Sequence, residues 1–164
     1  MKQRSTVKRL LNCLFILFFG INAFLASCQK SNNHHKKTVP LQAEFGTVST
    51  ILQAGPPELD SIAGQGDGTP IGKATFVAHA QFDANNVLTG LIVATSESGD
   101  EFFASITGHD PEIDESGNIT LHFQATITGG TGKFAGATGS FAGIARESIY
   151  NAAGSASWDG TITY

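Results

Sequence analysis

The sequence predicts an all-β domain, an antiparallel up-and-down β-barrel of about eight strands, with a β-sandwich or jelly roll as the alternative. Residues 119–128 alternate strictly between apolar and polar side chains, as in a strand with one buried and one solvated face. Short segments of this kind recur between turn signals from residue 41 to 164, and no segment has a helical period longer than two turns. Small residues alternate with aromatic ones, as in Ala74, Phe76 and Ala78, which is how a small barrel fills its tapering interior and favours the barrel.

The order of the elements follows from the alternation and the turn residues. Gly55-Pro56-Pro57 ends the first strand, and the glycine-rich stretch Glu58 to Pro70 predicts a long loop. Residues 87–96 are apolar on both faces, so we expect this strand to be covered on both sides. Residues 108–118 predict an acidic loop. The expected strands are 41–52, 71–82, 87–96, 101–107, 119–128, 140–150 and 155–164.

The N-terminal 27 residues are typical of a secretory signal peptide. The first ten residues carry four basic side chains and no acidic one, and an apolar run from Leu11 to Leu25 follows. That run is shorter than the ~20 residues that a membrane-spanning helix needs. The sequence Leu25-Ala26-Ser27-Cys28 resembles the lipobox of bacterial lipoproteins. An ordinary secretory signal with a chance cysteine is the alternative.

The lipobox resemblance implies a lipid anchor on Cys28. The family's signal peptide is cleaved before this cysteine, whose sulfur takes a diacylglycerol and whose new amino group is usually acylated, so palmitate is expected. Two or more acyl chains anchor a protein stably to a membrane. Gln29 follows in place of the aspartate that retains enteric lipoproteins in the inner membrane, so we expect the outer membrane of a Gram-negative cell envelope.

Residues 28–40 are expected to form a flexible tether between the lipid and the barrel domain, residues 41–164. The tether is polar and basic, and its lysines suit anionic headgroups. Its adjacent His34 and His35 suggest a metal, but a solvated linker is the preferred interpretation because no further ligand is placed nearby. Beyond residue 39 three basic residues face fourteen acidic ones, a net charge of −11 that argues against nucleic acid as a partner.

A glycine-dense turn at residues 129–139 lies between two predicted strands. Gly132-Lys133 suggests a phosphate loop, but Phe134 stands where that loop requires Ser or Thr. The dinucleotide fingerprint also fails, because further glycines follow where it needs a helix. We interpret the turn as a hairpin that closes one end of the barrel, with Phe134 and Phe141 as its plug and Lys133 exposed.

Three segments together are similar to the allene oxide cyclase-like and dirigent-like barrels. They are Thr126 to Gly139, the opening Gly72-Lys73-Ala74-Thr75, and the closing Trp158-Asp159-Gly160-Thr161-Ile162. The resemblance implies an eight-stranded up-and-down barrel over residues 41–164 with a hydrophobic cavity at one end. It also implies a cavity glutamate and aromatic residues for a cyclase, or acids, an arginine and a tyrosine for a dirigent protein. None of those residues maps onto this chain through a motif.

The ionisable residues do not form a recognisable catalytic set, and we assign no catalytic residue, metal or cofactor. Adjacent Arg146 and Glu147 point to opposite faces of a strand, so they cannot both line one cavity. The loop from Asp110 to Asn118 resembles the start of a calcium loop, but Glu115 stands where that loop needs glycine, so a solvated hairpin is preferred. The candidates on strands are Glu44, His79, Glu101, His122, Arg146 and Glu147.

The preferred function is a non-catalytic binding or structural module for an apolar small molecule. The phenylalanine-rich interior motivates it, and the expected ligand-binding residues are Phe76, Phe123, Phe134 and Phe141. A cyclase- or isomerase-like enzyme acting in the cavity is the alternative, and a cell-envelope protein that docks a partner is a third. An open interior with converging ionisable groups would favour the enzyme, whereas an interior filled by these four rings would argue against it.

Overall fold

The computed structural model describes residues 36–164, and the signal peptide, Cys28 and most of the tether lie outside this range. Nine strands and one short 3-10 helix make up the described chain. They are β1 (Thr38–Gln53), β2 (Glu58–Thr69), β3 (Gly72–Phe82), β4 (Val87–Ser96), β5 (Glu101–His109), β6 (Glu112–Ile113), β7 (Asn118–Gly130), η1 (Gly132–Phe134), β8 (Thr138–Ser148) and β9 (Ala153–Thr163).

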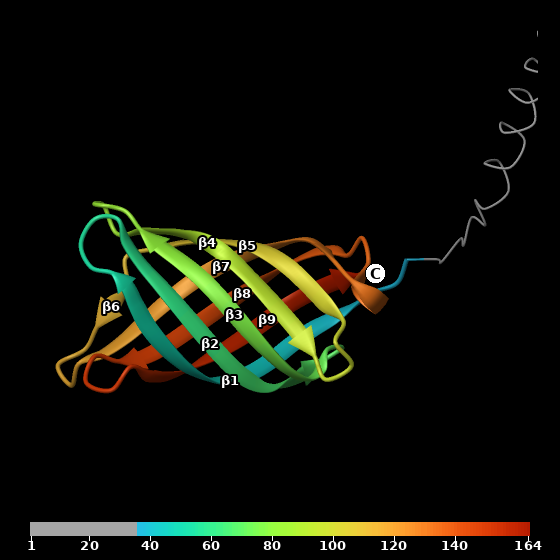
Figure 1. Ribbon diagram of the computed structural model, residues 1–164, viewed down its shortest axis with the longest axis horizontal. Helices are drawn as coiled ribbons and strands as arrows, with labels where there is room; N and C mark the ends of the chain where they lie inside the picture. The colour runs from blue at the N-terminus through green and yellow to red at the C-terminus, as the bar shows by residue number, and fades with distance from the viewer. Residues whose placement is uncertain (1–35) are drawn as a thin grey trace, which may run out of the picture. The chain divides into compact units, whose positions relative to one another are not determined.

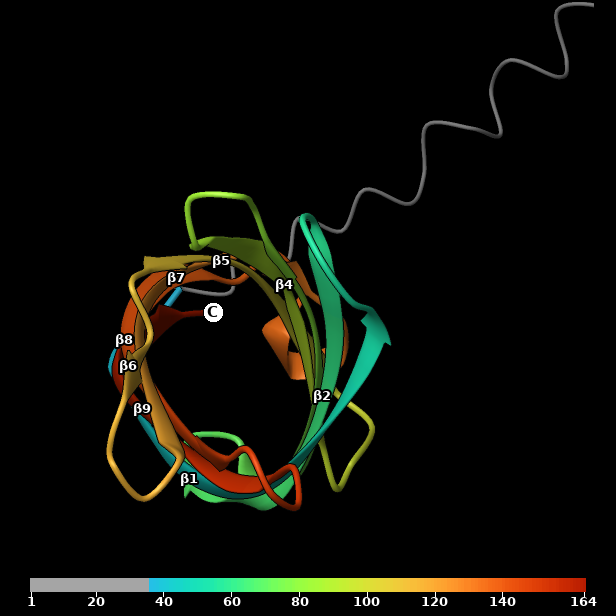
Figure 2. The same ribbon diagram turned by 90° about the vertical axis from the view of Figure 1, so that its left-hand side faces the viewer.

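Eight of the strands close into an antiparallel barrel, as Figures 1 and 2 show. Chain neighbours pair with each other from β1 to β5 and from β7 to β9, β1 pairs with β9, and β5 pairs with β7 to complete the ring. The two-residue β6 adds to β7 outside that ring. The predicted up-and-down barrel is therefore confirmed, and the sandwich alternative is wrong.

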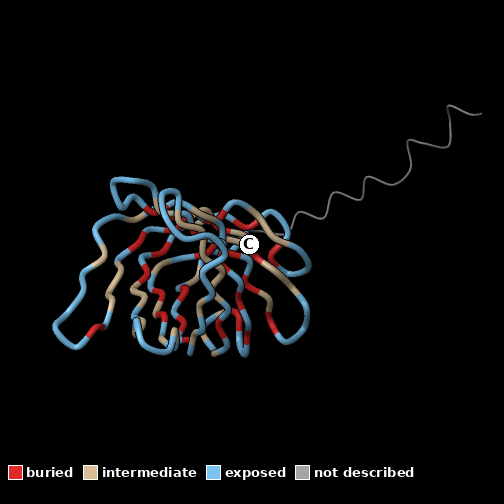
Figure 3. Tube along the Cα trace, turned by 60° about the vertical axis from the view of Figure 1, so that its left-hand side comes forward, coloured by how far each residue is buried: buried red, intermediate tan, exposed pale blue. Residues whose placement is uncertain are grey.

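The strict alternation of the strands separates a buried interior from a solvated exterior (Figure 3). On β3, Phe76 and Ala78 are buried, as expected for the inward face, and their neighbour His79 is exposed. The prediction that β4 is covered on both faces is wrong, because Leu91 is 61% exposed on the outside of the barrel. The apolar outer face of β4 has no second layer over it among residues 36–164.

The segment from Glu58 to Thr69 is a strand, and the prediction of a long loop there is wrong. β2 pairs with β1 along one edge and with β3 along its other edge. Its glycines fit where side chains would collide, because a Cβ at Gly64 would overlap the ring of Phe76 and one at Gly66 would overlap the backbone of Glu44. Glycine here marks close approach between strands and not a loop.

One end of the barrel is closed by the glycine turn, as predicted. Phe134, in η1, is fully buried and packs edge-on against Phe102 at 5.8 Å and Tyr164 at 5.0 Å. Phe141 lies deeper, on β8, with its ring centroid 4.9 Å from that of Trp158. Lys133 is exposed, with its Nζ 4.8 Å from the centroid of the Phe134 ring.

The chain enters the barrel at this closed end. β1 begins at Thr38, so the last three residues of the expected tether belong to the strand and pair with β9. Just before it, Lys36 donates from Nζ to the carbonyl oxygen of Gly136, in the glycine turn, at 3.0 Å. Within residues 36–164 no helix is long and apolar enough to cross a membrane.

Candidate ligand-binding cavity

The opposite end of the barrel opens into a cavity of about 620 Å³. This volume lies within the range of about 300–1,000 Å³ that is typical of small-molecule sites. The connections that surround its mouth are those between β1 and β2, β3 and β4, β5 and β7, and β8 and β9. The interior is therefore filled at one end and open at the other.

An aromatic cluster centred on Trp158 forms the inner limit of the cavity. The Trp158 ring lies 4.5 Å from Phe45, 5.1 Å from Phe76 and 4.9 Å from Phe141. Trp158 is only 3% exposed and lines the cavity, yet its Nε1 has no hydrogen-bond partner within the described chain. A buried indole N–H usually has an acceptor, so the unpaired donor is an unusual feature of this cluster.

Two phenylalanines that line the cavity are each seated over a glycine on a neighbouring strand. Phe76 on β3 lies over Gly64 on β2, and Phe123 on β7 lies over Gly143 on β8. A Cβ at either glycine would overlap the ring. Because glycine has no side chain, both rings can lie close to the barrel wall, and this leaves room in the centre of the barrel.

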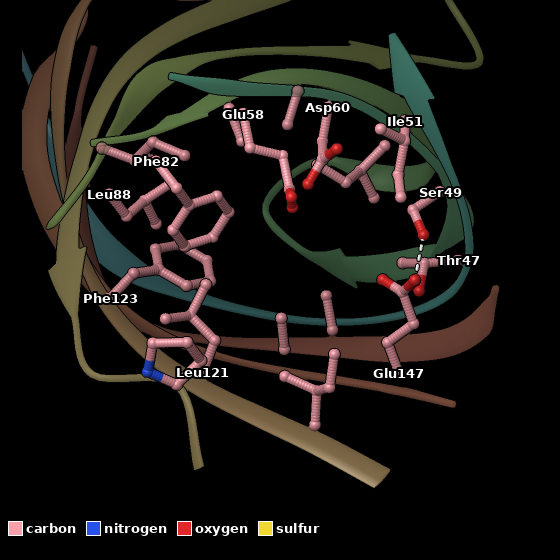
Figure 4. Close-up of a pocket in the computed structure, with 18 of the residues that line it drawn as sticks. Thr47, Ser49, Ile51, Glu58, Asp60, Phe82, Leu88, Leu121, Phe123 and Glu147 are labelled. Carbon is pink, nitrogen blue, oxygen red and sulfur yellow. Dashed lines mark hydrogen bonds between the residues drawn. The ribbon is translucent and has the colours of Figure 1, made fainter. Parts of the chain in front are cut away.

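Polar side chains gather on one side of the cavity, and apolar ones on the other (Figure 4). The polar side comes from β1, β2 and β8, whose inward side chains include the carboxylates of Glu58, Asp60 and Glu147. The apolar side comes mainly from β3, β4 and β7. Figure 4 labels Thr47, Ser49, Glu58, Asp60 and Glu147 on the polar side, with Ile51 beside Ser49 and Asp60, and Phe82, Leu88, Leu121 and Phe123 on the apolar side.

A hydrogen bond joins β1 to β8 across the intervening strand β9. Ser49 donates from Oγ to Oε1 of Glu147. Gly154 of β9 pairs with Thr47 on one side and with Glu147 on the other, so no side chain separates the two polar strands at this level. The glycine therefore makes the approach between Ser49 and Glu147 possible.

Asp60 is the most perturbed ionisable group in the cavity. Burial, reinforced by the negative charges of Glu58 and Glu147, raises its pKa from 3.8 to about 6. Its Oδ1 is buried and has no hydrogen-bond partner in the described chain. An unpaired carboxyl with a pKa near neutrality in a concave site is typical of a functional group.

The four phenylalanines predicted to bind a ligand fall into two groups. Phe76 and Phe123 line the cavity. Phe134 lies in the plug at the closed end, and Phe141 is packed within the aromatic cluster. The last two support the cavity from behind and are not part of its lining.

Most of the ionisable candidates lie outside the cavity. Glu44, His79 and His122 are exposed on the outer face of the barrel. The prediction that Arg146 and Glu147 cannot both line one cavity is wrong, because both belong to its lining, with Arg146 exposed and Glu147 half-buried. Glu101 is half-buried near the closed end, where its backbone oxygen accepts from the Thr131 amide.

The acidic loop is organised by its own hydrogen bonds. Asp114 accepts from the backbone amides of Ser116 and Asn118 and from the Asn118 side chain, and these bonds hold the pKa of its carboxyl below the usual range. Within residues 36–164 no group of three or more His, Cys, Asp or Glu side chains is arranged to hold a metal ion.

Sequence reasoning missed Asp60 and Glu58, because it assigned both to a loop. Their spacing was the available signal, since Glu58, Asp60, Ile62 and Gly64 alternate with outward residues as an inner face would. The polar Ser49 continues the inner face of β1 beyond Phe45 in the same way. Polar residues on an inward face are the sequence feature that marks the cavity.

Fold and site together define a closed eight-stranded antiparallel barrel with one plugged end and one open, partly acidic cavity. A scan against protein-family models finds no match. Comparisons with the curated proteins and with the solved structures find no significant match either. The case for function therefore depends on the cavity and on the N-terminal sequence.

Proposed function

We propose that this protein is a lipid-anchored protein of the cell envelope whose barrel binds an apolar small molecule without transforming it. The observation that carries the proposal is the open cavity of about 620 Å³ in a barrel whose other end is packed shut. Side chains fill the closed end of the barrel and leave this volume open, and a concave, mostly apolar space with a few polar groups is the usual form of a small-molecule site.

The rim of the cavity supports the same proposal. Ile51, Ile113 and Ile149 line the mouth and are 62%, 64% and 54% exposed. Large aliphatic side chains are costly to leave in water, so these three would gain from contact with an entering apolar molecule.

Anchoring on Cys28 suits this geometry. The chain enters the barrel at the closed end, beside Gly136, and the cavity opens at the opposite end. A lipid on Cys28, proposed from the lipobox resemblance, would leave the mouth free of the attachment point. The outer membrane of a Gram-negative bacterium is the proposed location.

The test combines extraction of bound compounds with a dye titration. A soluble chain from Gln29 to Tyr164, which lacks the expected lipid attachment residue Cys28 and contains the whole barrel, is purified without detergent, and organic extracts are analysed by mass spectrometry. The uncharged dye Nile red is then titrated, and we expect saturable binding. Ala78→Leu, which adds volume inside the cavity, should weaken binding, whereas Val77→Leu on the outer face of the same strand should not. No extracted compound and no saturable dye binding would refute the proposal.

A second candidate is a cyclase- or isomerase-like enzyme, and one observation favours it. Asp60 has a pKa of about 6 and converges on the cavity with Glu58 and Glu147, and general acid–base catalysis works best with a group whose pKa is near the working pH. Incubation of the extracted compound with fresh protein distinguishes the candidates. Recovery of the compound unchanged supports binding, and a product that wild type forms but Asp60→Asn does not supports catalysis.

A further inference from the structure

The polar side of the cavity carries a negative charge that the described chain does not neutralise. Glu58, Asp60 and Glu147 line the cavity, and the one basic residue of the lining, Arg146, is exposed and forms no ion pair with them within residues 36–164. Asp83, at the mouth, is engaged in its own turn, where it accepts from the amides of Asn85 and Val87. The one ion pair within residues 36–164 joins His109 to Asp110, on the exposed loop.

Two buried polar atoms in the lining have no partner in the described chain, and they differ in chemistry. Oδ1 of Asp60 is an acceptor on the acidic side, and Nε1 of Trp158 is a donor in a side chain that is 3% exposed. Buried polar atoms of this kind are rare in folded proteins, and each is costly unless a partner reaches it. Both atoms belong to residues that line the same cavity.

The apolar side of the cavity indicates the chemical character of the rest of the ligand. Phe82, Leu88 and Phe123 face the acidic side across the cavity (Figure 4). A molecule with a purely apolar surface would bury the carboxylates unpaired, and an anionic one would be repelled by them. A metal ion alone would leave the apolar side unused, and the described residues form no metal cluster.

We propose that the cavity binds a cationic amphiphile, a small molecule with an amine held by Asp60 and Glu147 and an apolar body packed against Phe123 and Leu88. The inference rests on the proposed function, since it names the class of molecule that the apolar cavity takes. A charge-assisted hydrogen bond to a carboxylate in a partly desolvated site is stronger than a neutral one, and this difference selects the amine.

The test compares three ligands of equal chain length, octylamine, octanol and octanoate, with Nile red as the reference for an apolar ligand. Trp158 is the only tryptophan of the chain and lines the cavity, so its fluorescence reports occupancy, and calorimetry gives the affinity. We expect octylamine to bind the soluble chain from Gln29 to Tyr164 about tenfold more tightly than octanol, the factor typical of a charged hydrogen bond, and octanoate to bind least.

Variants identify the side of the cavity that selects the amine. Asp60→Asn combined with Glu147→Gln should lower the affinity for octylamine to that for octanol and leave octanol unchanged. Glu44→Gln removes one carboxylate from the outer face of β1 and should change nothing. The ligand comparison in the wild-type chain needs no variant, so it holds even if the double variant folds poorly.

Each outcome separates this inference from the proposed function. Equal affinity for octylamine and octanol, or an unchanged affinity for octylamine in the folded double variant, overturns the cationic ligand and leaves the apolar-binding function in place. If Nile red binds and none of the three ligands does, the cationic ligand is likewise overturned and the apolar-binding function stays in place. Failure of Nile red and of all three ligands refutes both.

Discussion

The ring of Phe76 lies over the Cα of Gly64, its cross-strand neighbour on β2. The pair has two consequences for the molecule. It turns a glycine-rich segment into a strand, because the aromatic ring covers the backbone that glycine exposes. It also holds the ring against the wall, next to the cavity that Phe76 lines.

Gly64→Ala is expected to destabilise the barrel by about 1–3 kcal/mol, the range for overpacking a close-packed interior. The added methyl group would collide with Phe76, so the ring must move toward the cavity. Chemical denaturation measures the free energy of unfolding. Gly46→Ala is the matched control on β1, because a Cβ there would meet only the Gln65 carbonyl oxygen, at 4.0 Å, and should be neutral or slightly stabilising. Equal effects of the two substitutions would contradict the packing argument.

Strands and their inward faces could be predicted from the sequence wherever one face is apolar throughout. The alternation from Ile119 to Thr128 gave β7 and its buried Phe123, Ala125 and Ile127 correctly. Turn chemistry likewise placed the plug, since Phe134 follows glycines that permit the η1 turn, including Gly132 with a φ of 54°.

The acidic side of the cavity could not be predicted, because it depends on pairing between distant strands. Glu58 and Asp60 belong to β2, and Glu147 belongs to β8, and their convergence follows from closure of the ring and its register. The role of Gly154 could not be predicted either, because it depends on the pairing that places this glycine between Thr47 and Glu147. Register is set by the whole barrel and is not encoded by any one segment.

Phe134→Ala should lower the free energy of unfolding by about 3–5 kcal/mol, the usual cost of removing a fully buried aromatic ring. The ring is 0% exposed and contacts Phe102 and Tyr164, so its loss leaves a void at the closed end. Phe103→Ala removes a half-exposed ring from the outer face of β5 and should cost only about 1 kcal/mol. An unchanged melting temperature for Phe134→Ala would refute the role of the ring as a plug.

Cys28→Ser should abolish lipid attachment if the lipobox is genuine. In cells grown with radiolabelled palmitate, wild type should carry label and fractionate with membranes, and the variant should carry none. Cys13→Ser is the matched control, because Cys13 is the only other cysteine and lies within the predicted signal peptide. Label retained by Cys28→Ser would refute the anchor and leave the evidence for the cavity untouched.

Asp60→Asn should stabilise the folded protein at neutral pH and have no effect in acid. Folding raises the pKa of Asp60 from 3.8 to about 6, so the native state binds the proton more tightly than the unfolded state does. The wild type therefore loses stability as the pH rises through this interval, and the penalty is constant above it. Asparagine does not ionise, so the variant escapes the penalty.

The gain from Asp60→Asn should reach about 1 kcal/mol. A rise from 3.8 to about 6 corresponds to about 3 kcal/mol at most, and solvent at the open mouth screens the charges and reduces that figure. Denaturation of both proteins between pH 3.5 and pH 8 measures the difference, which should grow between pH 4 and pH 6, the interval set by the two pKa values. Asp159→Asn, on the exposed outer face of β9, should show no such pH-dependent gain. A gain for Asp60→Asn that is the same at every pH would show that it comes from packing or hydrogen bonding and not from the buried charge.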